Sequence, residues 1–456
     1  MVNDVDWSLY DETPDNDLIK TLKVWTGIDY NMTYQGDFDG QGHVINGLCF
    51  ISTTGFIANA KNAVFRNIGI ENCRAIINEK SPAGILCGTA DSCSFTNCYV
   101  TGHLESDNSS AAGLVGGAID CAFEHCYNLA VIKGYSAVAG ITCGGESGYN
   151  RKSVLKFDNC WNAGLISSTD NFCTLAISGI ASSYGGSFAG TTLNNCYNIG
   201  HILCISNCGD ENAPGGLVAG DLQGKAFLFN CYNLGEVTGT GGKNNCFAGI
   251  FGGNPYNMYP MRNYDFSKEE NDGFCLHNCY YLNKCMGDYW NDSCSSNYHD
   301  LDIHAMTAEQ FANGEVCYRL NKGVTDGTQP YYQNLNVIRD SSALRSSDIT
   351  IDAYPVVEKT HRTVYNDGDE YFNYGTLTGS KGSSADNLEP VFYTKDRTIY
   401  VGNVVGRIML SDVNGRSFYS KKVQNPGTSN FIEIPIQQSG SYLLVINGKA
   451  YKVMVK

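Results

Sequence analysis

One short phrase recurs along the first two thirds of the chain, and each copy contains a cysteine. The copies read HCYNLAVI at 125–132, NCWNAGLI at 159–166, NCYNIGHI at 195–202 and NCYNLGEV at 230–237. A second phrase, such as AAGLVGG from Ala111 or AGIFGG from Ala248, precedes most of these copies. Repetition at such intervals indicates a solenoid, in which each repeat buries its apolar face against its neighbours.

Both phrases are short apolar runs bounded by glycine and asparagine, which is typical of strands and turns. No stretch before about residue 305 has a sustained helical apolar stripe. The sequence therefore predicts an all-β fold, a right-handed parallel β-helix over residues 1–305. Equal positions of stacked coils lie about 4.8 Å apart, so we expect a column of inward cysteines: Cys73, Cys98, Cys126, Cys160, Cys196, Cys231 and Cys279.

The same stacking predicts the neighbours of each cysteine. We expect Cys231 to point inward above Cys196, Asn233 to turn the corner, and Gly235 to begin the next stretch. Each copy also has an apolar residue shortly before its cysteine: Phe95, Phe123, Phe157, Leu193 and Phe229.

The 20 cysteines allow four interpretations. A metal site would need close pairs such as Cys-x-x-Cys, which the chain lacks. A catalytic thiol needs a neighbouring base, and no cysteine differs from its copies in this respect. Packing of cysteine as a small apolar residue is the interpretation we favour. Disulfides stay open for the insertion that carries Cys275, Cys279, Cys285 and Cys294.

The segment GDFDGQGHVINGL at 36–48, followed by the AGLVGG-like phrases, resembles the GLUG-motif repeat proteins. These are secreted or surface proteins of Bacteroidetes and some Gram-positive bacteria. The resemblance covers roughly residues 34–300 and implies a secreted or surface repeat protein.

After the repeats, residues 306–366 are expected to form a helix-containing cap. Thr307 and Gln310 have the spacing of a capping box, and a short amphipathic helix over the last coil would cover its exposed edge. Residues 367–387 have the composition of a linker. Residues 388–456 alternate apolar and polar positions, which predicts a small β-sandwich.

The C-terminal β-sandwich resembles the sorting domain of the type IX secretion pathway, and an Ig-like accessory domain is the alternative. The first of these implies export, contact with the secretion machinery, and a secreted or outer-surface location. The acidic N-terminus has no secretory signal, so we expect that a leader has been removed. No apolar run is long enough for a transmembrane helix.

Charge and motifs limit the chemistry. The net charge of −15 disfavours nucleic acid and anionic membranes as partners. Paired acids occur at Asp37-x-Asp39 and Asp300-x-Asp302, and the other acids are scattered. We found no catalytic triad, phosphate-binding loop, metal site or cofactor motif. The sequence therefore favours a non-enzymatic, adhesin-like protein; the alternative is a polysaccharide lyase or glycoside hydrolase on a β-helix.

Aromatic residues in the insertions are the predicted ligand site. Exposed aromatic side chains in long loops suit sugar stacking or contact with a protein. The ligand, a glycan or a surface protein, is expected at six residues: Tyr256, Tyr259, Tyr264, Tyr289, Trp290 and Tyr298.

Overall fold

The computed structural model forms two compact units, residues 1–379 and residues 380–456. The residues it describes are 5–6, 33–51, 53–144, 153–168, 176–183, 188–205, 214–220, 225–239, 248–252, 273–285, 302–339, 351–374, 391–395, 398–402, 406–412, 417–423, 432–436, 440–446 and 449–455. Among these residues, no helix is long and apolar enough to cross a membrane.

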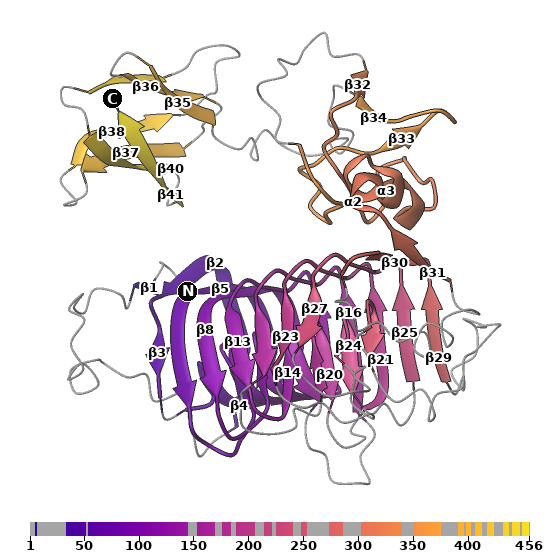
Figure 1. Ribbon diagram of the computed structural model, residues 1–456. Coiled ribbons are helices and arrows are strands. Elements are labelled where there is room, and N and C mark those ends of the chain that lie inside the picture. Colours follow the sequence, from indigo (N-terminus) through magenta and orange to yellow (C-terminus); the bar gives the residue numbers. More distant parts are fainter. Residues whose placement is uncertain are drawn as a thin grey trace. The chain divides into compact units, whose positions relative to one another are not determined.

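The first unit contains a parallel β-helix, whose coils follow one another along a single axis (Figure 1). The predicted all-β fold and parallel β-helix are confirmed. Its largest sheet contains β1 (Val5–Asp6), β2 (Asp37–Asn46), β3 (Cys49–Phe50), β5 (Val64–Ile77), β8 (Ser94–Ser106), β11 (Ala122–Glu124), β12 (Tyr127–Asn128), β13 (Val131–Gly134), β16 (Ser153–Asp158), β17 (Trp161–Asn162), β18 (Ile166–Ser168), β21 (Phe188–Asn194), β22 (Tyr197–Asn198), β23 (Ile202–Cys204), β25 (Lys225–Phe229), β26 (Tyr232–Asn233), β27 (Val237–Gly239), β29 (Gly273–His277), β30 (Cys279–Leu282) and β31 (Ile303–Met306).

The glycine-rich phrases form the other two sheets of the β-helix. The second sheet contains β4 (Ile57–Lys61), β7 (Cys87–Asp91), β10 (Val115–Ile119), β15 (Thr142–Gly144), β20 (Ala181–Ser183), β24 (Val218–Gly220) and β28 (Phe251–Gly252). The third contains β6 (Ala83–Gly84), β9 (Ala111–Ala112), β14 (Ala137–Ala139) and β19 (Ala176–Ser178). Small residues suit these strands because successive backbones approach closely: a Cβ on Gly88 of β7 would lie 2.6 Å from the carbonyl oxygen of Ala58 in β4.

The predicted cysteine column lies in the core, with two corrections of register. Cys126, Cys160, Cys196 and Cys231 are fully buried. Cys73 does not belong to the column, because it pairs with Gly102, whereas Ile68 pairs with Cys98. In the column of larger apolar residues, Leu228 rather than Phe229 pairs with Leu193 and enters the core. The last copy was misaligned by one residue, and such a slip moves a side chain to the opposite face of the strand.

The corner is turned one residue before the cysteine, not at Asn233 as predicted. Asn195 and Asn230 have left-handed backbones, with φ of 54° and 53°, a conformation that asparagine adopts more readily than most residues. Asn233 is instead fully buried. Its side chain accepts a hydrogen bond from the N–H of Gly235 at 3.2 Å and donates to its carbonyl oxygen at 3.0 Å.

The segment after the β-helix starts with two short helices, α2 (Ala308–Ala312) and α3 (Glu315–Leu320). Thr307 and Gln310 form the predicted capping box. We expected one helix, but Gly314 has a φ of 94° and separates the two. Short strands follow: β32 (Ile338–Arg339), β33 (Tyr365–Asn366) and β34 (Tyr371–Tyr374). The last of these lies within residues 367–387, which were expected to be a linker.

The helices pack on the flank of the last coils. Phe311, Leu320 and Tyr331 share an apolar cluster with Tyr197 and Tyr232 of the β-helix. The exposed edge of β30, which we expected the helix to cover, pairs instead with β31 in parallel. The segment from 306 to 374 is called the cap below.

The second unit consists of two antiparallel sheets, in agreement with the predicted small β-sandwich. One contains β35 (Val391–Lys395), β36 (Thr398–Gly402) and β39 (Ile432–Pro435). The other contains β37 (Gly406–Asp412), β38 (Ser417–Val423), β40 (Gly440–Ile446) and β41 (Lys449–Val455). Their buried residues form one core: Ile399, Ile408, Leu410, Ile434, Ile436, Leu444 and Val453.

Candidate functional site

The aromatic residues predicted to bind a ligand lie outside the described residues, so that site stays a prediction. They are Tyr256, Tyr259, Tyr264, Tyr289, Trp290 and Tyr298.

The aromatic residues of the repeats form a column on the flank of the β-helix. Tyr99, Tyr127, Trp161, Tyr197 and Tyr232 stack in this order, with ring centroids 4.8, 4.4, 5.7 and 4.9 Å apart. The last two are buried in the apolar cluster of the cap, and the first three are half-buried. Because each ring covers the face of the next, the column presents ring edges to solvent. Sugar stacking needs ring faces, so this column is a poor platform for a glycan.

The acid pair at the start of the β-helix is occupied by an ion pair. Asp37 and Asp39 contact Arg66 at 2.8 and 3.0 Å. Hydrogen bonds from the backbone of Gln41, from the side chain of Asn67 and from Arg66 lower the pKa of Asp39 to about 2. These carboxylates hold two coils together, and the lowered pKa makes Asp39 poorly suited to proton transfer.

Asp302, from the second predicted acid pair, joins the last coil to β31. One of its oxygens lies 2.8 Å from Nδ1 of His277, and the other lies 2.7 Å from Nε2 of His304. It also accepts a hydrogen bond from the backbone N–H of Asn278 at 2.8 Å. Within the described ranges, no group of histidines, cysteines and acids has the geometry to hold a metal ion.

The cysteine column does not provide a nucleophile. Burial raises the pKa of Cys160 and of Cys196, and the Sγ of Cys160 donates to the backbone oxygens of Phe123 and Asp158 at 3.5 and 3.4 Å. A reactive cysteine needs a stabilised thiolate and exposure. Cys126, Cys160, Cys196 and Cys231 are fully buried, so they lack this exposure and pack as apolar residues.

The disulfide-bonded cysteine of the structure is not one of the insertion cysteines for which disulfides were left open above. Cys275, Cys279 and Cys285 are free thiols, and Cys294 lies outside the described residues. Cys204, in β23, is disulfide-bonded.

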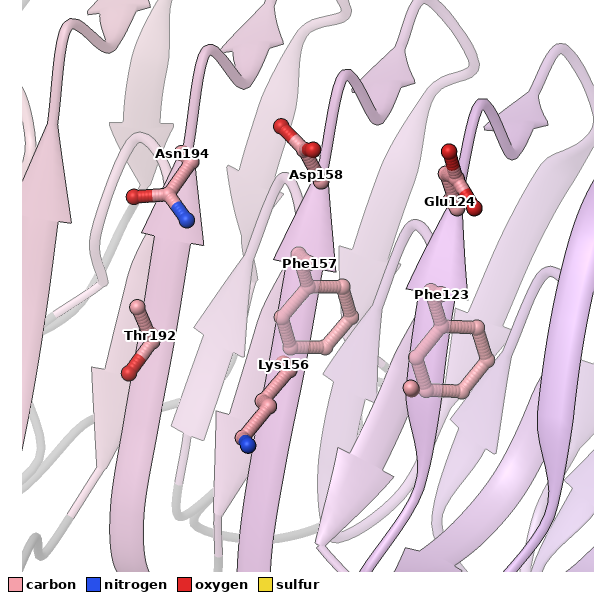
Figure 2. Close-up of a pocket in the computed structure, with 8 residues that line it drawn as sticks. Phe123, Glu124, Lys156, Phe157, Asp158, Thr192 and Asn194 are labelled. Atoms are coloured by element: carbon pink, nitrogen blue, oxygen red, sulfur yellow. The ribbon is translucent and has the colours of Figure 1, made fainter.

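A hollow lies across the outer side of β11, β16 and β21 (Figure 2). Its volume is about 540 Å³. Glu124, Asp158 and Asn194 lie side by side near the ends of the three strands in Figure 2. The residues that line the hollow are Ala122, Phe123, Glu124, Lys156, Phe157, Asp158, Thr192 and Asn194.

Strand register arranges the outward side chains of this face in two rows. One row contains Thr96, Glu124, Asp158 and Asn194, each paired with the next across a parallel strand. Adjacent members are therefore about 4.8 Å apart along the axis. The second row, two residues earlier in each strand, contains Ser94, Ala122, Lys156 and Thr192.

Charge in the hollow is mixed. Burial raises the pKa of Asp158 although Asn195 donates a hydrogen bond to its Oδ1 at 3.2 Å. Glu124 also raises this pKa, and His125 opposes the shift. Nδ1 of His125 lies 3.7 Å from Glu124, and Lys156 supplies an ammonium group in the second row. The hollow thus offers charged and neutral hydrogen-bonding groups to one ligand.

Sequence reasoning missed this site because it looked for acids close together in the chain. Glu124 and Asp158 are 34 residues apart but each stands two residues before its repeat cysteine, Cys126 or Cys160. Alignment of the copies on their cysteines would have placed the two carboxylates on adjacent strands. Asp158 is the last residue of β16.

Comparison with known proteins identifies no family. No family model matches the chain, and no curated protein matches it. One similar solved structure, from Bacteroides ovatus, is described as a "putative immunoglobulin A1 protease". It is 16% identical, with a TM-score of 0.44 over 78% of this chain and 84% of that chain, and it supports no statement about activity. The fold itself defines the class: an all-β protein built on a parallel β-helix.

Proposed function

We propose that this chain is a secreted or cell-surface repeat protein that binds a glycan on the outer face of its β-helix and acts without catalysis, as an adhesin does. The observation that carries the proposal is the polar hollow across β11, β16 and β21. Its carboxylates, ammonium, hydroxyl and amide groups are the donors and acceptors that sugar hydroxyls use. A protein partner is the other ligand class that the sequence allows.

A glycan array probed with the purified full chain tests this function. We expect binding that the double variant Glu124→Gln/Lys156→Ala weakens about tenfold or more, because each lost charged hydrogen bond is worth roughly 1.5–3 kcal/mol. The matched control is Glu79→Gln/Lys80→Ala, which changes the same residue types at exposed positions away from the hollow. Absence of binding to every glycan would reject the proposal.

One observation favours a second function, glycoside hydrolysis. Glu124 and Asp158 place two carboxyl groups on neighbouring strands, and burial raises the pKa of Asp158, as a general acid requires. Release of reducing sugar by the full chain, lost in Asp158→Asn but kept in Glu79→Gln, would replace the binding function with this one.

For location, we propose that the second unit directs the protein to the outer surface, as its resemblance to a type IX sorting domain suggests. The GLUG-like repeats point to the same class of exported protein. Removal of residues 388–456 from the full chain should abolish labelling by a membrane-impermeant reagent on intact cells. Unchanged surface labelling would favour an Ig-like accessory domain.

A further inference from the structure

We infer that the glycan is a linear chain without acidic groups that lies along the axis of the β-helix, with successive sugar units over successive strands. This inference rests on the proposed function and specifies its ligand. It follows from how the polar side chains of the outer face repeat.

The repeat of the protein matches the repeat of an extended glycan. Parallel strands are about 4.8 Å apart, which is close to the length of one pyranose unit in an extended chain. Thr96, Glu124, Asp158 and Asn194 therefore present one polar group per sugar unit, in register. A ligand laid parallel to one strand would meet only one member of this row.

At each end, the polar rows stop where a side chain of a different kind takes the next position. Toward the N-terminus, the next residue of the first row is Arg66, which is held by Asp37 and Asp39. Toward the C-terminus, the next members of the two rows are Phe227 and Phe229. Between these two ends the polar rows cover four strands. This is a length of roughly 14 Å, which is enough for about four sugar units.

The charge of the hollow favours a neutral sugar over an acidic one. Two carboxylates, Glu124 and Asp158, face one ammonium group, Lys156, in a chain whose net charge is −15. A uronic acid or sulfated chain would bring further negative charge to this face and would be repelled. Neutral sugars use the same groups as hydrogen-bond partners without this cost.

The hollow exists because Ala122 has only a methyl group between larger neighbours of its row. It is exposed and points outward from β11. A large side chain at this position would fill the path along the axis and leave every charged and polar group of the rows in place. Ala122→Tyr therefore tests whether the ligand follows this path, because it blocks the path without removing a polar contact.

The experiment is calorimetric titration of the full chain with a neutral oligosaccharide series, of one to six units, taken from the array hits. We expect affinity to rise with each added unit up to about four and then to level. Ala122→Tyr should weaken the tetrasaccharide at least tenfold. Leu129→Tyr, which adds the same side chain at a residue that is 42% exposed on the aromatic flank, should leave it unchanged.

The outcomes distinguish the ligand geometry from the function. If a monosaccharide binds as tightly as a tetrasaccharide, or if Ala122→Tyr has no effect while the protein keeps its circular dichroism spectrum, the axial path is wrong but glycan binding stands. If acidic chains of equal length bind better, the inference that the ligand is neutral is wrong. If no member of the series and no array glycan binds, both are wrong.

Discussion

Asn198 is one member of a buried amide column that also contains Asn128, Asn162 and Asn233. Its Nδ2 donates to Asn233 at 2.8 Å and to the carbonyl oxygen of Gly200 at 2.9 Å. Its Oδ1 accepts from Asn162 at 2.7 Å and from the N–H of Gly200 at 3.2 Å. These four bonds fill the capacity of one amide group, so the residue after the aromatic position in each repeat is set by hydrogen bonding.

Asn198→Ala should lower the free energy of unfolding by about 3 kcal/mol, because it leaves the buried donors and acceptors of its neighbours without partners. The midpoint of denaturant unfolding measures the loss. Asn108→Ala is the control, since Asn108 is exposed and donates one bond, to Asn78. Equal midpoints for the two variants would contradict a structural role for the column.

At the scale of elements, the cap is held by aromatic contacts. The rings of Phe311 and Tyr331 lie 5.6 and 5.9 Å from that of Tyr232. The hydroxyl of Tyr331 donates to the backbone oxygen of Asn230 at 2.8 Å, and the hydroxyl of Tyr232 donates to that of Pro355. The helices are too short to be stable alone, so their order depends on this packing.

Phe311→Ala should destabilise the cap by about 4 kcal/mol, as for other buried aromatic residues. Hydrogen exchange should accelerate at α2, at α3 and at the amide of Tyr232, and stay slow in β5 and β8. Thr307→Ala, which removes only the N-cap, should cost about 1 kcal/mol. Uniform acceleration in all coils would show that the cap and the β-helix unfold as one.

The cap also contains a pH-dependent contact. Nδ1 of His361 lies 2.6 Å from Oδ2 of Asp352, which also accepts from the N–H of Asn334. The hydrogen bond with Asp352 raises the pKa of His361 in the folded state, above about 6.5 in the unfolded chain. The stabilisation is thus complete below pH 6.5 and is lost as the pH rises through the higher, folded pKa.

Melting curves of the full chain between pH 5 and pH 9 test this contact. We expect the transition of the first unit, which contains the cap, to move to lower temperature above pH 6.5, and this movement to be reduced in His361→Gln. The control is His43→Gln, a change of the same kind outside the cap. An unchanged pH dependence in His361→Gln would show that other groups are responsible.

At the scale of the whole molecule, the chain divides into two compact units. Residues 1–379 and 380–456 are separate compact units, and the second has its own apolar cluster around Ile408, Leu410 and Leu444. Thermal unfolding should show two transitions. A substitution in the second core, such as Leu410→Ala, should lower one of them by several degrees and leave the other unchanged. A single transition that shifts as a whole would indicate energetic coupling of the units.

Much of the β-helix could be predicted because its constraints repeat. Cys126, Cys160 and Cys196 occupy the same place in consecutive copies, so their burial follows from the period alone. Phe229 was misplaced where one residue of register separates an inward from an outward side chain. Cys73 is buried, but Ile68 holds the position that pairs with Cys98. Short phrases do not fix register that finely, whereas the backbone pairing does.

The sequence by itself determined the parallel β-helix, the capping box at Thr307 and the strand pattern of the second unit, because period and local hydrogen bonding specify these. Only the tertiary structure decided which outward side chains meet. Glu124 and Asp158 become neighbours because a coil brings residues 34 positions apart to within one strand spacing, and Ala122 lines the same hollow. No local pattern specifies the length of a coil, because that length depends on where each insertion begins and ends relative to the strands.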